Sequence, residues 1–146
     1  MTNSRPQSTI ESLSDEQFLG EFEALSLHPE HFNHLGHLRI GWLYLNRYKR
    51  QNAVKKVCRG IKAYAESLGA SDKFNLTITD ALMQIMANRI EQQGIDSWQA
   101  FLALNPDLID NALAVLQRYY SAAVLFSEAA KVERLAPDIR AIGIGT

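Results

Sequence analysis

The chain has 146 residues, of which 47% are hydrophobic and 21% charged, and its formal net charge is −1. These values are ordinary for one soluble globular domain and exclude a strongly basic nucleic-acid-binding protein. The single cysteine, Cys58, excludes an intramolecular disulfide and a Cys-rich zinc site. No apolar run approaches the roughly 20 residues that span a bilayer, and residues 1–10 lack the apolar centre of a signal peptide. We therefore expect a cytoplasmic protein with a disordered N-terminus over 1–10.

Helical signals follow one another along the chain, and no segment shows the strict alternation that predicts a strand. Ser14 and Gln17 form a capping-box pattern, and Pro29 suits the first turn of a second helix. The predicted helices cover about 14–26, 29–48, 51–69, 77–92, 97–104 and 110–120, with short helical turns over 121–134. Asp110 is a candidate cap for the sixth helix. We predict an all-α fold, a compact bundle of about six helices, with one domain over 11–138 and an irregular tail over 139–146.

All four histidines of the chain lie in the stretch HPEHFNHLGH, residues 28–37. On a helix over 31–48, an apolar stripe toward the core comprises Phe32, Leu35, Leu38, Trp42 and Leu45. A neighbouring stripe comprises His34, His37, Gly41, Tyr44 and Tyr48. The positions expected to face solvent are Arg39, Asn46 and Arg47. His34 and His37 therefore border the core, whereas His28 and His31 belong to the helix entrance. Because glycine costs a helix roughly 1 kcal/mol relative to alanine, we expect another helix or a ligand to approach closely at Gly41.

Three interpretations of His34 and His37 remain open. They can be half-buried neutral histidines that hydrogen-bond to their neighbours. They can ligate a metal, since imidazoles three residues apart on a helix can share one ion, with a further ligand from Glu30, Asp72 or Asp80. They can also bind a polar or anionic small molecule, because the residues around them are basic. From His31 to Ala65 there is no Asp or Glu, and the basic residues are Arg39, Arg47, Lys49, Arg50, Lys55, Lys56, Arg59 and Lys62.

Four blocks of the chain resemble, in the same order, a family of uncharacterised bacterial all-helical proteins. The blocks are FNHLGHLRIGWLYL, DKFNLTIT, WQAFLALNPDL and RYYSAAVLFSEAA followed by PD, over about 32–138. Members of that family carry F-x-H-x-x-H-(L/V)-R-x-(A/G)-W-x-Y-L, then Y-H-E-T-(I/L)-T, then W-x-x-F-x-x-x-N-P-x-L, then a Tyr-Tyr-Ser segment. The resemblance implies an all-helical fold and names no reaction.

The resemblance places the histidines of the first block on His34 and His37. The His-Glu pair of the second block falls on Asn75 and Leu76, so this chain lacks the imidazole and carboxylate that would complete a two-helix metal site. Metal is therefore disfavoured, and no metal is expected, with His34 and His37 as the ligand candidates if one binds. Thr77 and Thr79 match the family pattern.

A polar cluster between the second and fourth helices is the site that we predict from these residues. Asn75 and Thr79 lie one helical turn apart, although helix capping would equally explain Asn75 and Thr77. The residues predicted to line a small-molecule site are His34, His37, Tyr44, Asn75, Thr77 and Thr79. If the site is catalytic, His34 or His37 is the candidate general acid or base, because the pKa of histidine lies near working pH.

The remaining features favour ordinary structural roles. Cys58 lies on the apolar stripe of the third helix and is expected in the core. The basic segment 47–62 is expected to be a solvated helix face, and we do not expect nucleic-acid binding. We predict a small-molecule binding or catalytic site, with the cofactor and reaction unknown. The alternative is a non-catalytic interaction or scaffold protein that forms a homodimer through an apolar helix face and uses its histidines structurally.

Overall fold

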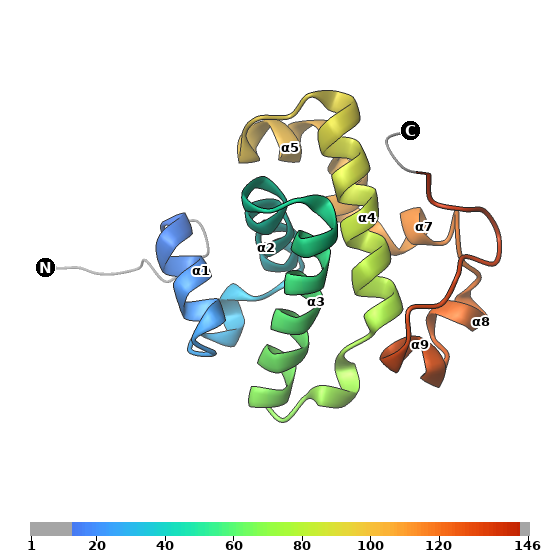
Figure 1. The fold of residues 1–146 in the computed structure, drawn as a ribbon, viewed down its shortest axis with the longest axis horizontal. Coiled ribbons are helices and arrows are strands. Elements are labelled where there is room, and N and C mark those ends of the chain that lie inside the picture. Colours follow the sequence, from blue (N-terminus) through green and yellow to red (C-terminus); the bar gives the residue numbers. More distant parts are fainter. Residues whose placement is uncertain (1–12, 144–146) are drawn as a thin grey trace, which may run out of the picture.

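The computed structural model describes residues 13–143, and these residues fold into helices connected by short links (Figure 1). The α-helices are α1 Asp15–Glu23, α2 His34–Arg47, α3 Arg50–Ser67, α4 Leu76–Gln93, α5 Trp98–Leu104, α6 Pro106–Asp110, α7 Ala112–Leu116, α8 Ala122–Leu125 and α9 Glu128–Val132. Two short 3-10 turns are η2 Pro29–His31 and η3 Ser71–Lys73. The predicted N-terminal segment 1–10 and the last three residues of the predicted tail lie outside the described residues.

The all-α fold is confirmed, but the described range contains nine α-helices where about six were predicted. The expected helix over 110–120 is replaced by α6 and α7, because the chain turns at Asn111, whose φ of −154° and ψ of 48° are not helical. Pro106 occupies the first turn of α6, as its fixed φ allows. Asp110 is the last residue of α6, so its predicted role as a cap is wrong. The predicted turns over 121–134 form two helices, α8 and α9.

The first helix begins as predicted and ends earlier. The Ser14 side chain accepts a hydrogen bond from the Gln17 amide at 3.1 Å, and the Gln17 side chain accepts one from the Ser14 amide at 3.1 Å. The helix ends at Glu23, and Leu25 has a φ of 61°, in the left-handed region that non-glycine residues rarely adopt. Leu25 is 45% exposed and does not join Phe18 and Phe22 of α1 in the core.

The helix that carries His34 and His37 starts at His34 and not at Pro29. Asn33 is its N-cap, and the Asn33 side chain accepts a hydrogen bond from the Gly36 amide at 2.9 Å. His28 caps the separate turn η2, where its ring nitrogen accepts a hydrogen bond from the Glu30 amide at 3.2 Å. The four histidines therefore divide between two elements, and only His34 and His37 lie on α2.

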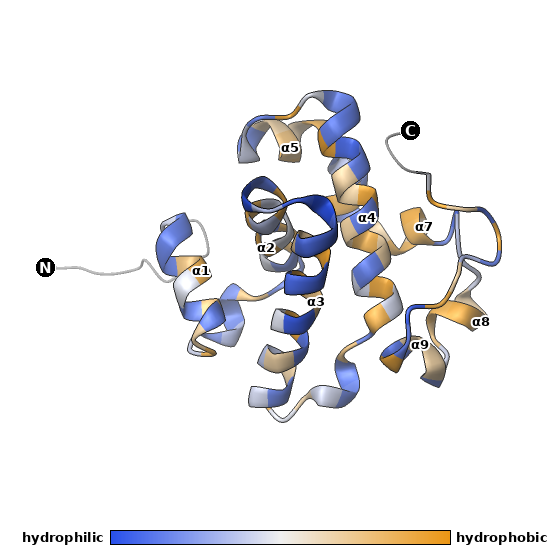
Figure 2. Cartoon of the chain, viewed as in Figure 1, coloured by the Kyte–Doolittle hydropathy of each residue, from blue (hydrophilic) through white to orange (hydrophobic). Residues whose placement is uncertain are grey.

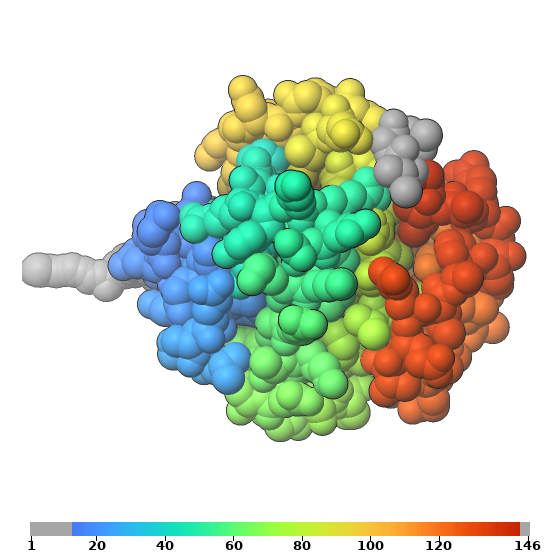
Figure 3. All heavy atoms as spheres, viewed as in Figure 1, coloured from blue at the N-terminus to red at the C-terminus, as the bar shows by residue number. Residues whose placement is uncertain are grey.

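Helices α2, α3 and α4 pack together at the centre of the fold (Figure 1). Helix α1 covers one side of α2 and α3, and α7 and α9 pack against α4. The buried apolar residues of these helices form one core. Figure 2 shows that α3 turns a hydrophilic face outward, and Figure 3 shows its side chains forming the surface between α1 and the C-terminal segment. The exposed basic residues of this face are Lys55, Lys56, Arg59 and Lys62.

No helix within residues 13–143 is both long enough and apolar enough to cross a membrane. Cys58 is buried in the core, as expected. Burial raises the pKa of its thiol to about 12, which makes thiolate chemistry unfavourable at neutral pH.

Two glycines let neighbouring helices approach closely. A Cβ atom at Gly41 would lie 2.5 Å from Met83 Sδ, so the close approach that we predicted there is made by α4. A Cβ atom at Gly60 would lie 2.7 Å from the Phe22 ring of α1. Met83 ends in a flexible thioether that can move aside, whereas the Phe22 ring is rigid and fully packed.

We expect Gly60→Ala to lower the free energy of unfolding by about 1 kcal/mol, because the overpacking penalty exceeds the gain in helix propensity. Gly20→Ala in α1 is the matched control, since no atom lies within 4 Å of a Cβ atom built there. That variant should gain up to about 1 kcal/mol from helix propensity alone. Urea denaturation of both variants measures the difference. Equal effects would show that the contact between Gly60 and Phe22 is loose.

Candidate functional site

A pocket of about 470 Å³ lies between α2 and α4 and is closed on one side by α7. Its size falls in the range of small-molecule sites in proteins. Four of the six predicted site residues line it: His34, His37, Asn75 and Thr79. The apolar residues of the lining are Phe32, Ile61, Phe74, Ile78, Leu82, Met83, Ala112, Leu113 and Leu116. We call this space the histidine pocket.

The His34 ring is held by a backbone group from a distant part of the chain. Its Nε2 atom lies 2.7 Å from the carbonyl oxygen of Leu108 in α6. A carbonyl oxygen can only accept, so Nε2 carries the proton and donates it. In neutral His34 the Nδ1 atom is therefore an acceptor, and it has no hydrogen-bond partner within residues 13–143.

Unlike the His34 ring, the His37 ring makes its backbone hydrogen bond through Nδ1. Its Nδ1 atom donates to the backbone carbonyl oxygen of Asn33 at 2.8 Å, one helical turn earlier. The ring stacks on Phe32 with a centroid separation of 4.0 Å and an angle of 25° between the planes. These contacts leave Nε2 as the acceptor of the neutral ring, and no group in the described range hydrogen-bonds to it.

Burial lowers the pKa of His37 below its usual 6.5, and the nearby His34 lowers it further, against the opposing hydrogen bond to Asn33. His37 is therefore neutral at pH 7 and can accept a proton at Nε2. Of the two histidines that the sequence offered as a candidate acid or base, His37 is the one with a lowered pKa.

Asn75 and Thr79 line the pocket while stabilising the start of α4. The Asn75 side-chain oxygen accepts from the Ile78 amide at 2.9 Å, and its side-chain nitrogen donates to the Leu125 carbonyl at 2.8 Å. The Thr79 hydroxyl donates to the Asn75 backbone carbonyl at 2.8 Å. Asn75 therefore caps α4, which is the structural role that the sequence offered as the alternative to ligand binding.

Tyr44 and Thr77 do not line the histidine pocket. The Tyr44 hydroxyl donates to the Glu23 carboxylate of α1 at 2.5 Å, and burial together with that carboxylate raises the pKa of Tyr44 well above its usual value. The Thr77 hydroxyl donates to the Glu133 carbonyl at 2.6 Å and accepts from the Leu135 amide at 3.0 Å. Both side chains connect separate parts of the fold.

The charge of the pocket lining has one sign. Lys73, from η3, lines the pocket with His34 and His37, and no Asp or Glu of residues 13–143 does so. Lys73 forms no ion pair with any described residue. Sequence reasoning missed Lys73 because it lies between the helices predicted over 51–69 and 77–92. Its position two residues before Asn75 was the available signal.

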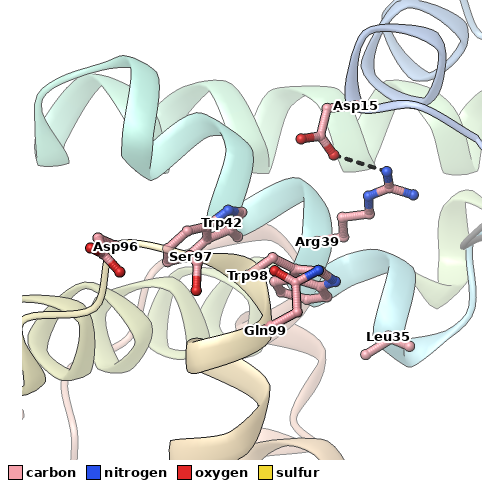
Figure 4. Close-up of a pocket in the computed structure, with 8 residues that line it drawn as sticks. All are labelled: Asp15, Leu35, Arg39, Trp42, Asp96, Ser97, Trp98 and Gln99. Carbon is pink, nitrogen blue, oxygen red and sulfur yellow. Dashed lines mark hydrogen bonds and ion pairs between the residues drawn. The ribbon is translucent and has the colours of Figure 1, made fainter.

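A second hollow, of about 400 Å³, lies between α1, α2 and α5 (Figure 4). Arg39, which we predicted to face solvent, is buried here: it donates to Asp15 at 2.8 Å and to the Leu13 carbonyl at 2.8 Å, and its guanidinium lies 4.5 Å from the centroid of the Phe18 ring. That prediction is wrong, because Asp15 from another helix neutralises Arg39. Asp96 adds a negative charge to the lining. This hollow therefore favours anions less than the histidine pocket does.

None of the three carboxylates that the sequence offered as extra metal ligands, Glu30, Asp72 and Asp80, lines the histidine pocket. Asp80 pairs with Arg134 at 3.2 Å, and Glu30 lies 3.9 Å from His28. Within the described part of the chain, no three His, Cys, Asp or Glu side chains are grouped closely enough to share a metal ion.

Comparison of the chain with protein-family models, with curated protein sequences and with solved structures finds no significant match. The resemblance seen in the four sequence blocks stays a prediction.

Proposed function

We propose that the protein binds a small anionic molecule in the histidine pocket and that His37 exchanges a proton with it. One observation carries this proposal: a pocket of about 470 Å³ has His34, His37 and Lys73 in its lining and no carboxylate from the described residues. An anion there meets a permanent positive charge at Lys73 and two imidazoles that can become cations.

The geometry of the two rings supports a role in proton transfer. Each ring uses one nitrogen to donate to a backbone carbonyl, at 2.7 Å for His34 and 2.8 Å for His37. A fixed ring presents its second nitrogen in one direction, which is what a general base needs. The bound molecule would be an acid or hydroxyl compound whose proton lies within reach of His37 Nε2.

The coupling between protonation and binding has a definite sign. The pKa of His37 is lowered from its usual 6.5, so the ring is neutral at pH 7 in the free protein. The groups that face it are His34 and Lys73, both basic, so an incoming anion favours the protonated ring. By linkage, the bound anion raises the pKa of His37, and anion affinity increases as the pH falls through that pKa.

Butanoate is a suitable first probe, because it supplies a carboxylate and a short apolar group. We expect saturable shifts of the His37 ring signals in NMR titrations, an upward shift of the His37 pKa, and tighter binding at about pH 6, where butanoate is still an anion, than at about pH 8. Butylamine should produce neither effect. His37→Asn should reduce the pH dependence to the part that His34 contributes, whereas His28→Asn should leave it unchanged, because His28 is exposed and outside the pocket.

The proposal fails if butanoate and inorganic phosphate both leave the His34 and His37 signals unchanged at concentrations that saturate millimolar binding. It also fails if His37→Asn and His28→Asn alter butanoate binding equally. Thermal denaturation of each variant in the absence of ligand shows whether the variant is folded.

A further inference from the structure

A smaller hollow of about 170 Å³ adjoins the histidine pocket. Five residues line both spaces: Phe32, His37, Ile61, Lys73 and Phe74. The two spaces therefore adjoin along a common wall, and His37 and Lys73, which carry the polar chemistry of that wall, stand at the junction. The smaller hollow adds the side chains of Pro29, Tyr64, Ala65, Leu68 and Ala70.

The surfaces on either side of this junction are mostly aliphatic. In the larger space Ile78, Leu82, Met83 and Leu116 are positioned by α4 and α7. Leu113 is 41% exposed and Leu68 is 48% exposed, so each hollow has an exposed leucine in its lining. Met83 has a flexible side chain that adapts to the shape of an apolar ligand.

Charge in the two linings is confined to the junction and to His34. Lys73 is the permanent cation of both linings, and neither contains an Asp or Glu from residues 13–143. An occupant that complements both features has one anionic group and an extended aliphatic part. A small polar anion alone would leave the aliphatic surface of the pocket in contact with water, which is unfavourable.

We propose that the ligand is an unbranched aliphatic acid, with its anionic group between His37 and Lys73 and its chain along Ile78, Leu82 and Leu116. This inference rests on the proposed function, which it narrows from small anions to acids with an alkyl chain. A fatty acid, an alkyl phosphate and the acyl chain of a larger molecule share this chemistry.

Chain length is the variable that tests the proposal. For butanoate, hexanoate, octanoate and decanoate, followed by the His37 ring signals, we expect affinity to rise roughly fourfold per methylene until the larger space is filled. Decyl phosphate should bind comparably to decanoate, because both supply an anionic group and the same alkyl chain. Decanol and decyltrimethylammonium should bind less tightly than decanoate, because neither supplies a negative charge.

Two matched pairs of variants locate the binding. Lys73→Met should weaken decanoate binding about two- to fivefold, and Lys62→Met, at an exposed lysine outside both spaces, should not. Leu113→Asp places a carboxylate in the lining and should weaken decanoate binding more than Leu104→Asp, which alters a 51% exposed leucine away from it.

The outcomes separate the two proposals. If butanoate perturbs His37 but affinity does not rise with chain length, the aliphatic ligand is refuted and the anion site stands. If no acid of the series perturbs His37, both are refuted. Equal binding of decanoate and decyltrimethylammonium, or equal losses for Lys73→Met and Lys62→Met, would refute placement of the anionic group at the junction.

Discussion

Replacing Asn105 by leucine is expected to lower the free energy of unfolding by about 3 kcal/mol, the largest effect that we predict. Asn105 is fully buried where α5 meets α6. Its side-chain nitrogen donates to the Phe101 carbonyl at 2.9 Å and to Gln93 at 3.0 Å, and its side-chain oxygen accepts from Arg89 at 2.8 Å. Leucine has a similar volume but makes none of these bonds, so buried polar groups lose their partners.

The chain contains a close control for this substitution. Asn111 joins α6 to α7 much as Asn105 joins α5 to α6, but it is exposed and its side chain makes no capping hydrogen bond. Asn111→Leu should therefore change stability by less than about 0.5 kcal/mol. Urea denaturation of both variants decides the matter, and equal losses would mean that the buried hydrogen bonds contribute nothing beyond the helix junction itself.

The Asn105 network also bears on the histidine pocket. Arg89 makes two hydrogen bonds to the Asp107 carboxylate, each 3.0 Å long, and Arg89 lowers the pKa of that carboxyl. Asp107 precedes Leu108, whose carbonyl oxygen accepts a hydrogen bond from His34 Nε2. The network thus holds α6 where it orients His34. We expect Asn105→Leu to broaden the His34 ring signals while the protein is still folded.

Thr77→Val is expected to lower the free energy of unfolding by about 2 kcal/mol. Valine nearly matches the shape of threonine, but it cannot donate to the Glu133 carbonyl or accept from the Leu135 amide, which Thr77 now bonds at 2.6 Å and 3.0 Å. Thr77 is fully buried, so water does not readily replace the hydroxyl. The segment after α9 should then separate from α4 more easily, which hydrogen exchange of the Leu135 amide measures.

Thr79→Val is the comparison for this variant. The Thr79 hydroxyl donates only to the Asn75 carbonyl, which already accepts the Thr79 amide at 3.0 Å, so its loss should cost less than about 0.5 kcal/mol. Thr77→Val should leave the response of His37 to butanoate unchanged, because Thr77 does not line the pocket. A folded Thr77→Val protein that no longer responds to butanoate would contradict this separation of roles.

Local signals in the sequence determined the helical fold and the pairing of His34 with His37. Caps and apolar spacing act over three or four residues, so Ser14 and the stripe through Leu38 and Trp42 could be identified without a structure. Positions one turn apart on a helix also face the same way. For this reason His34 with His37, and Asn75 with Thr79, could each be predicted to lie together on one face of a helix.

The tertiary structure decided which polar side chains point into that site. Tyr44 bonds to Glu23, Thr77 to the backbone at Glu133, and His34 to the backbone at Leu108, and these partners lie 21, 56 and 74 residues away along the chain. Helical periodicity carries no information at such separations. It therefore predicted a single polar cluster of six side chains, whereas the folded chain places two of them, Tyr44 and Thr77, outside the pocket lining. The same limit explains why Lys73 was not predicted, because only the folded chain places η3 where Lys73 lines the pocket together with the histidines.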